Sequence, residues 1–158
     1  LLLLIAANIQ QGTTMKFIRT ILLCLFAAFS VNAASACSIT YYALNGQVTK
    51  SLKASGGFSA KKYDEVCAKL NKANAQLLIN TQNGVANGRA VSYAYIMVMD
   101  RNLPIVNIHT MGGSVQLSPD ASTTKSEVLL AVAVNEAIDS IDIDAAIVGL
   151  NQARKQVK

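Results

Sequence analysis

The feature that most constrains the fold is a run of mostly apolar residues at 90–99, in the second half of the chain. Its odd positions carry Val, Tyr, Tyr, Met and Met, and positions 92–98 carry Ser, Ala, Ile and Val at the even places. Successive side chains of a strand point to opposite faces of a sheet, so this strand is apolar on both faces. A strand of that kind belongs at the centre of a sheet.

Turn and break signals divide the sequence around this run. A loop is predicted at 80–89, where Asn83-Gly84 and Asn87-Gly88 are both turn dipeptides. After the run, Asp100-Arg101-Asn102 turns the chain, and Pro104 can only begin the next strand, at 105–110, because proline has no N–H to donate. Met111-Gly112-Gly113 indicates a further break before a short strand at 114–117.

The N-terminal part of the domain reads as a hairpin followed by a helix. Residues 38–44 are rich in β-branched and aromatic types and end at Asn45-Gly46, a hairpin signal that predicts a returning strand at 47–52. Ser55-Gly56-Gly57 breaks the pattern, and Ser59 can cap the next helix. The apolar face of that helix has the spacing i, i+3, i+4, i+7 and consists of Tyr63, Val66, Cys67 and Leu70.

The last third of the chain is predicted to be helical. Thr124 and Glu127 fit a capping box ahead of a broad apolar face made of Val128, Leu129, Val132, Ile138 and Ile141. A second helix is expected from about Asp144 to Arg154-Lys155, with acid at its start and base at its end. The predicted order is β-β-α-β-β-β-α-α. This is the α+β class, an antiparallel sheet of about four to five strands with helices packed on one side.

A secretory signal peptide is predicted at 15–33. Met15 is followed by two cations, Lys16 and Arg19, then by an apolar run at 21–29 and small residues up to position 36. This order is typical of a signal peptide, and the apolar run is shorter than the roughly 20 residues that span a bilayer. Cleavage is expected after Ala33 or Ala36. The alternative interpretation is a buried helix of the folded domain.

Two consequences follow for the organisation of the chain. Residues 1–14 are interpreted as a non-native upstream extension and 34–158 as a single globular α+β domain. A ribosome-binding sequence is compatible with the codons before Met15, and the chain has no Asn-x-Ser/Thr sequon. Both observations favour a bacterial protein, located in the periplasm or secreted.

Cys37 and Cys67 remain after the signal peptide leaves with Cys24, and in an oxidising compartment they are expected to pair. The closed loop of about 31 residues would stabilise the fold by about 3.5–4 kcal/mol in the chain-entropy model. The alternative rests on a resemblance: Ala34-Ser35-Ala36-Cys37 resembles a bacterial lipobox, although Ala34 stands where leucine is expected. Lipidation of Cys37 would bring the protein to a membrane, and we expect membrane association in that case alone.

Charge and residue content argue against several functions. Loss of Lys16 and Arg19 lowers the net charge of +5 by two, and so mild a positive charge does not argue for nucleic acid, which usually needs a clustered basic face. His109 is the one histidine, so no zinc ligand set is available, and no metal or other cofactor is expected. A hydrolase using His109 with Ser114 and Asp100 is conceivable, but a half-buried strand histidine explains the same residue.

The tyrosines are the more suggestive group. Tyr93, Tyr95 and Met97 share one strand face, and Tyr41 would join them in one amphipathic patch if the first strand lies beside the 90–99 strand. Tyr and Met are enriched in protein interfaces. The alternative places these rings in the core with their hydroxyls at its rim.

The 80–89 loop is the second candidate binding region, because loops often carry binding residues. Asn83, Asn87 and Arg89 are its candidate contacts, and its alternative is a plain hairpin connection.

The function expected from these features is that of a small, exported, non-enzymatic binding protein, inhibitor-like or immunity-like, that contacts another envelope or extracellular protein. A lipid-anchored or structural component of the cell envelope is the alternative. A small hydrolase using His109 comes third.

Overall fold

The computed structural model describes residues 37–157, which form a four-stranded mixed sheet with four helices packed on it. The elements in chain order are β1 (Tyr41–Ala43), α2 (Gln47–Ala54), α3 (Tyr63–Lys72), β2 (Ala75–Ala86), β3 (Arg89–Asp100), β4 (Val106–Ser118), α4 (Thr123–Ser140) and α5 (Ile143–Gln156). The predicted α+β class is confirmed. The signal peptide at 15–33 and the extension at 1–14 lie outside the described residues.

The strand order in the sheet is β1-β2-β3-β4. β3 pairs antiparallel with β2 on one side and with β4 on the other, so the apolar run at 90–99 lies inside the sheet as predicted. β1 pairs with β2 in parallel, with Tyr41 opposite Leu77. The prediction of a wholly antiparallel sheet is therefore wrong. The chain passes from β1 to β2 through the helices α2 and α3, and not through a hairpin turn, so the two strands run in the same direction.

The predicted strand at 47–52 is the helix α2. Val48, Ser51 and Leu52 are buried, which is the i, i+3, i+4 spacing of a helix face. Gly46 has a right-handed φ of −73°, so Asn45-Gly46 does not form the predicted two-residue turn. Instead the Asn45 side chain accepts a hydrogen bond from the N–H of Gln47 (3.2 Å) and donates to the carbonyl of Thr81 (2.8 Å), which fixes the entry to α2 on β2.

The segment at 80–89 is not a loop but the end of a long β2–β3 hairpin. Gly84 lies within β2, opposite Val91, so Asn83-Gly84 is no turn. The turn is Asn87-Gly88, whose residues have φ of +50° and +70° between the closing pair Ala86 and Arg89. Two positive φ values define the primed turn that matches the twist of the strands it joins.

β4 is one strand where two were predicted. Its register with β3 shifts between Met97, which lies opposite Met111, and Val98, which lies opposite Asn107, so residues 108–110 bulge out of the ladder. The predicted break at Gly112 is also absent. A side chain there would place its Cβ 2.2 Å from the carbonyl oxygen of Ala137, so this glycine lets α4 lie directly on the strand.

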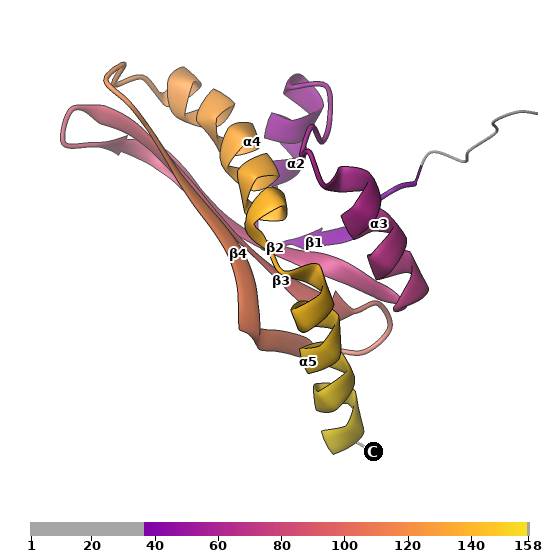
Figure 1. The fold of residues 1–158 in the computed structure, drawn as a ribbon. Helices are drawn as coiled ribbons and strands as arrows, with labels where there is room; N and C mark the ends of the chain where they lie inside the picture. The colour runs from indigo at the N-terminus through magenta and orange to yellow at the C-terminus, as the bar shows by residue number, and fades with distance from the viewer. Residues whose placement is uncertain (1–36, 158) are drawn as a thin grey trace, which may run out of the picture. The chain divides into compact units, whose positions relative to one another are not determined.

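The four helices lie on one side of the sheet (Figure 1), and the core fills the space between them. α4 crosses β2, β3 and β4, and α5 packs on β3 and β4. The inner side chains of the strands alternate with outer ones, and the largest fully buried side chains are Leu70, Leu77, Ile79, Ile96, Leu130, Ile138, Ile141 and Leu150.

The Cys37–Cys67 disulfide is present, as predicted, with a Cα–Cα distance of 6.0 Å. It connects the residues before β1 to α3, where Val66, Cys67 and Leu70 are buried as the periodicity indicated. Tyr63 supports the same junction, because its hydroxyl donates to the carbonyl of Cys37 at 3.1 Å.

Helix starts differ from the sequence prediction by a few residues. α3 begins at Tyr63, and the backbone N–H of Ser59 donates to Asn135 (2.7 Å), so Ser59 is not its cap. α4 is capped by Ser122, whose hydroxyl accepts from the N–H of Lys125. Val128 and Val132, predicted to be buried, are 57% and 40% exposed.

Arg154 of α5 anchors the C-terminal helix. Its guanidinium donates to the carbonyls of Ala73 and Asn74, both at 3.0 Å, and to the carboxylate of Asp100 at the end of β3 (2.7 Å). Within residues 37–157, no helix is long and apolar enough to cross a membrane.

Candidate functional site: the open face of the sheet

The side of the sheet opposite the helices has no element packed on it within the described part of the chain. We call it the open face. Its apolar members are Tyr42 of β1, Leu78 of β2, Val91, Tyr93, Tyr95, Met97 and Met99 of β3, and Val106, Met111, Val115 and Leu117 of β4. In β3 the even positions from 90 to 100 are buried against the helices, whereas the odd positions are partly or fully exposed.

Strand register brings these side chains into rows across the sheet. Tyr42, Leu78, Met97 and Met111 lie opposite one another in turn, so one apolar row crosses all four strands. Directly opposed side chains on one face are close enough to contact. The open face is therefore a contiguous apolar surface.

The two tyrosines of β3 lie within this surface. The ring centroids of Tyr93 and Tyr95 are 5.4 Å apart, and the Tyr93 hydroxyl donates to Gln82 of β2 at 2.6 Å. Tyr93 lies opposite Val115, which is 58% exposed, and Tyr95 lies opposite Gly113 and is 40% exposed. The Tyr93 ring thus has an apolar body on the surface and its hydroxyl on Gln82, and the Tyr95 ring lies against Gly113 of β4.

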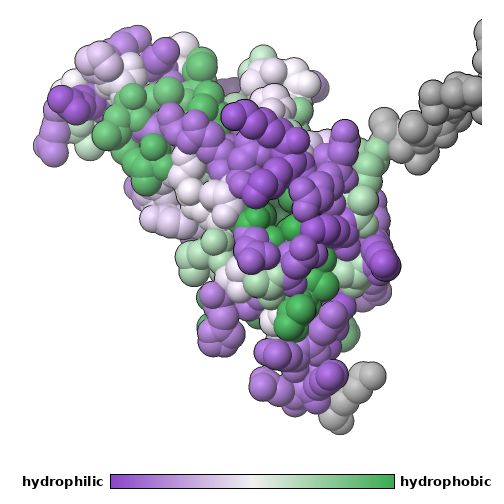
Figure 2. Space-filling view, viewed as in Figure 1, coloured by the Kyte–Doolittle hydropathy of each residue, from purple (hydrophilic) through white to green (hydrophobic). Residues whose placement is uncertain are grey.

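Charge is nearly absent from the open face. Among the described strand positions that point to this side, Arg89 at the hairpin tip carries the one charge, and the polar positions of β2 are Gln76, Asn80 and Gln82. The helical side is different: hydrophilic residues cover most of it, with hydrophobic areas near the start of α4 and at α5 (Figure 2). Contiguous apolar surface with a polar rim marks an interaction site more often than chance exposure does.

Of the predicted patch, Tyr93, Tyr95 and Met97 lie together on the open face, but Tyr41 does not. β1 lies beside β2 and not beside β3, and Tyr41 points to the helical side, where its ring meets that of Phe58 edge-on at 5.6 Å. Tyr42, 55% exposed, takes the place expected for Tyr41.

Sequence reasoning also missed the contribution of β4. Met111, Val115 and Leu117 are 53–58% exposed and stand at alternate positions with Gly113 between them. That alternation is a strand signal, but the Gly112-Gly113 pair concealed it by suggesting a break.

The candidate residues of the 80–89 segment lie at the tip of the hairpin. The Asn83 amide donates to the hydroxyl of Ser126 at 3.2 Å and so ties the hairpin to the start of α4. Asn87 forms the turn and Arg89 is exposed beside it. These residues belong to a strand end that is held in place.

His109 is exposed in the β4 bulge, where its backbone N–H donates to Asn107 at 2.9 Å. The partners considered for it bond elsewhere: Ser114 donates to Glu136 at 2.7 Å, and Asp100 accepts from Arg154. In the described residues, no group of three or more His, Cys, Asp or Glu side chains gathers as metal ligands would. The hydrogen bonds of the described residues therefore join His109 to neither Ser114 nor Asp100.

Comparisons of the chain with protein-family models, with curated protein sequences and with solved structures gave no match, so the open face itself is the basis for inferring a function.

Proposed function

We propose that the protein is a small, exported, non-enzymatic binding protein that contacts another envelope or extracellular protein through the open face of its sheet. The observation that carries this proposal is the apolar row from Tyr42 to Met111 on a face with almost no charge. Leaving such a surface in water is unfavourable, and a protein partner would remove it from water.

The size and chemistry of the open face suit a protein partner. Strands of about 12 residues at a rise of 3.3 Å and a spacing of 4.8 Å give an area of about 40 Å by 15 Å, roughly 600 Å². A standard interface buries about 800 Å² on each partner, so this face would supply most of one. A nucleic acid partner would require clustered Lys and Arg, and a face whose charge is confined to Arg89 does not offer them.

Export is supported by two features. The Cys37–Cys67 disulfide is of the kind that persists in an oxidising compartment, and the sequence at 15–33 has the order of a signal peptide. The bridge also favours a free binding protein over a lipid-anchored one, because a lipid on Cys37 would require the same sulfur atom.

The test is capture of partners from envelope extracts with the exported, disulfide-bonded protein and two matched variants. Val115→Lys places a charge in the open face, and Val148→Lys places the same charge on α5, where the valine is equally exposed at 57%. We expect Val115→Lys to reduce capture at least tenfold and Val148→Lys to leave it unchanged, with both variants folded by circular dichroism. Equal capture by the two variants would rule out the open face as the binding surface.

A further inference from the structure

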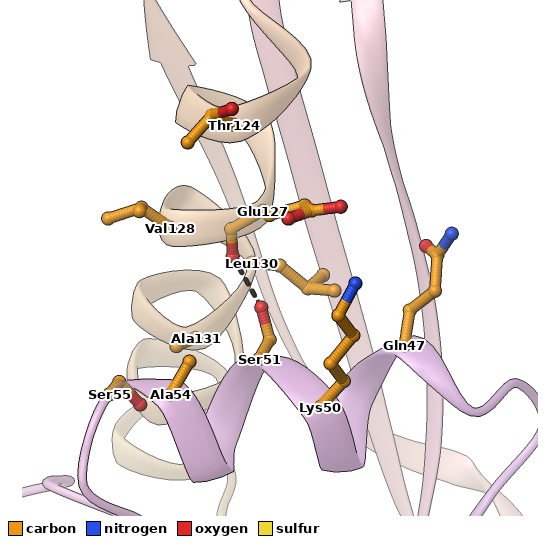
Figure 3. Close-up of a pocket in the computed structure, with 10 residues that line it drawn as sticks. All are labelled: Gln47, Lys50, Ser51, Ala54, Ser55, Thr124, Glu127, Val128, Leu130 and Ala131. Atoms are coloured by element: carbon orange, nitrogen blue, oxygen red, sulfur yellow. Dashed lines mark hydrogen bonds between the residues drawn. The ribbon is translucent and has the colours of Figure 1, made fainter.

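A pocket of about 360 Å³ lies between α2 and α4, on the helical side of the sheet. Its lining is shown in Figure 3 and comes from Gln47, Lys50, Ser51 and Ala54 of α2, from Ser55 directly after that helix, and from Thr124, Glu127, Val128, Leu130 and Ala131 of α4. Pockets that bind small molecules are typically 300–1,000 Å³, mainly apolar, with a few polar groups. This pocket meets both criteria.

The pocket has a polar end, which carries both charged side chains, and an opposite end lined by small apolar and hydroxyl side chains. Figure 3 shows the polar groups of Gln47, Lys50 and Glu127 on one side, and on the other side Ala54 and Val128 together with the hydroxyl side chains of Ser55 and Thr124. Leu130 is fully buried beneath them and Ala131 is 4% exposed, so the floor is apolar core. A ligand matching this lining has a charged head and an apolar chain.

The two charged side chains at the polar end have opposite signs. Within residues 37–157, neither the Lys50 ammonium nor the Glu127 carboxylate takes part in any hydrogen bond or ion pair. Both can therefore bind a ligand without first breaking a bond. The walls are also fixed in advance, because the Ser51 hydroxyl donates to the backbone carbonyl of Glu127 and holds the two helices together.

We propose that this pocket binds a single-chain zwitterionic amphiphile of the lysophosphatidylethanolamine type. The phosphate would pair with Lys50, the ammonium with Glu127, and the acyl chain would cover Ala54, Val128 and Ala131. A head with a single charge would bring a like charge close to one of the two side chains, and an uncharged head would pair with neither. Such lipids belong to membranes, which an exported envelope protein meets. The proposal uses none of the residues of the open face.

The test compares four probes that share one twelve-carbon tail, each titrated below its critical micelle concentration by calorimetry. They are lauroyl-lysophosphatidylethanolamine, laurate, dodecylamine and dodecyl maltoside. We expect the zwitterion to bind most tightly. Exposed charge pairs contribute about two- to fivefold in affinity. Lys50→Gln should therefore lower the affinity for the zwitterion and for laurate by that factor, and should not lower the affinity for dodecylamine. Glu127→Gln should lower the affinity for the zwitterion and for dodecylamine, and should not lower the affinity for laurate.

Two further variants separate the pocket from general surface binding. Ala54 is exposed at the end of α2, so Ala54→Trp should fill the pocket without disturbing the core and abolish binding of all four probes. Lys53→Gln changes the same charge on the same helix outside the pocket and should have no effect. Unchanged binding to Ala54→Trp, or to a Val128→Trp variant if the first fails to fold, would overturn the site. Binding of the maltoside or of either singly charged probe as tightly as the zwitterion would overturn the assignment of the ligand.

Discussion

Replacing Asp100 by Asn tests the anchorage of the C-terminal helix. The Asp100 side chain is 6% exposed, and one of its oxygens accepts from the backbone N–H groups of Asn102 (2.7 Å) and Leu103 (2.8 Å). The other accepts from Arg154, which is 22% exposed. Asn can keep the two backbone bonds, but its NH₂ group would face the guanidinium. Breaking a buried ion pair costs about 3–5 kcal/mol, and the partial exposure of Arg154 reduces this to about 2–4 kcal/mol.

The effect should depend on pH in a defined direction. Burial by itself raises the pKa of Asp100, but the hydrogen bonds from Asn102 and Leu103 and the charge of Arg154 together outweigh it, so the pKa lies below its usual value. A group with a lowered pKa stabilises the fold fully above its unfolded pKa, near 4, and loses that contribution as the pH falls through the folded pKa. The difference between wild type and Asp100→Asn is therefore full at pH 7 and shrinks below about pH 4.

The measurement is urea unfolding followed by circular dichroism at pH 7, 5 and 3, with the exposed Asp120→Asn as a control. The control should change the free energy of unfolding by less than about 0.5 kcal/mol. A loss below 1 kcal/mol for Asp100→Asn at pH 7, or a difference of equal size at pH 7 and pH 3, would refute the role assigned to this pair.

Three other outcomes are expected. Reduction of the disulfide should lower the free energy of unfolding by about 3.5–4 kcal/mol, and an unchanged melting temperature with and without reductant would contradict this. Gly112→Ala should destabilise the fold by about 1–3 kcal/mol or more, because the new Cβ would meet the Ala137 carbonyl. Gly84→Ala should leave the stability nearly unchanged in the same thermal melts, because no atom lies within 4 Å of the Cβ added there. His109→Ala should change neither stability nor partner capture, since this side chain is exposed in the bulge; loss of capture would bring the histidine into the function.

Local patterns predicted the elements whose signals agree over several residues. The apolar residues on both faces of the 90–99 run placed β3 inside the sheet, and the spacing of Val66, Cys67 and Leu70 predicted the buried face of α3. The segment at 47–52 failed because Asn45-Gly46, a strong hairpin signal in isolation, here leads into a helix. The Asn45 side chain also donates to the carbonyl of Thr81, a tertiary contact that a local pattern does not contain.

The candidate site was predictable only in part for the same reason. Alternation alone puts Tyr93, Tyr95 and Met97 on one face, whatever covers that face. The choice between Tyr41 and Tyr42 depends on which strand lies beside β1 and in which direction, and that follows from the path of the chain through α2 and α3. The α2–α4 pocket was not predictable at all, because it depends on 47–52 being helical.

The parallel pairing of β1 has a consequence for how the chain reaches its native state. β2, β3 and β4 are joined by short connections, so their ladders form between neighbours in the sequence. Tyr41 meets Leu77 only after the intervening chain has folded into two helices, and contacts across such a separation are slow to form. The disulfide closes most of this same segment into a ring. Oxidation before folding would therefore shorten the search that brings β1 to β2.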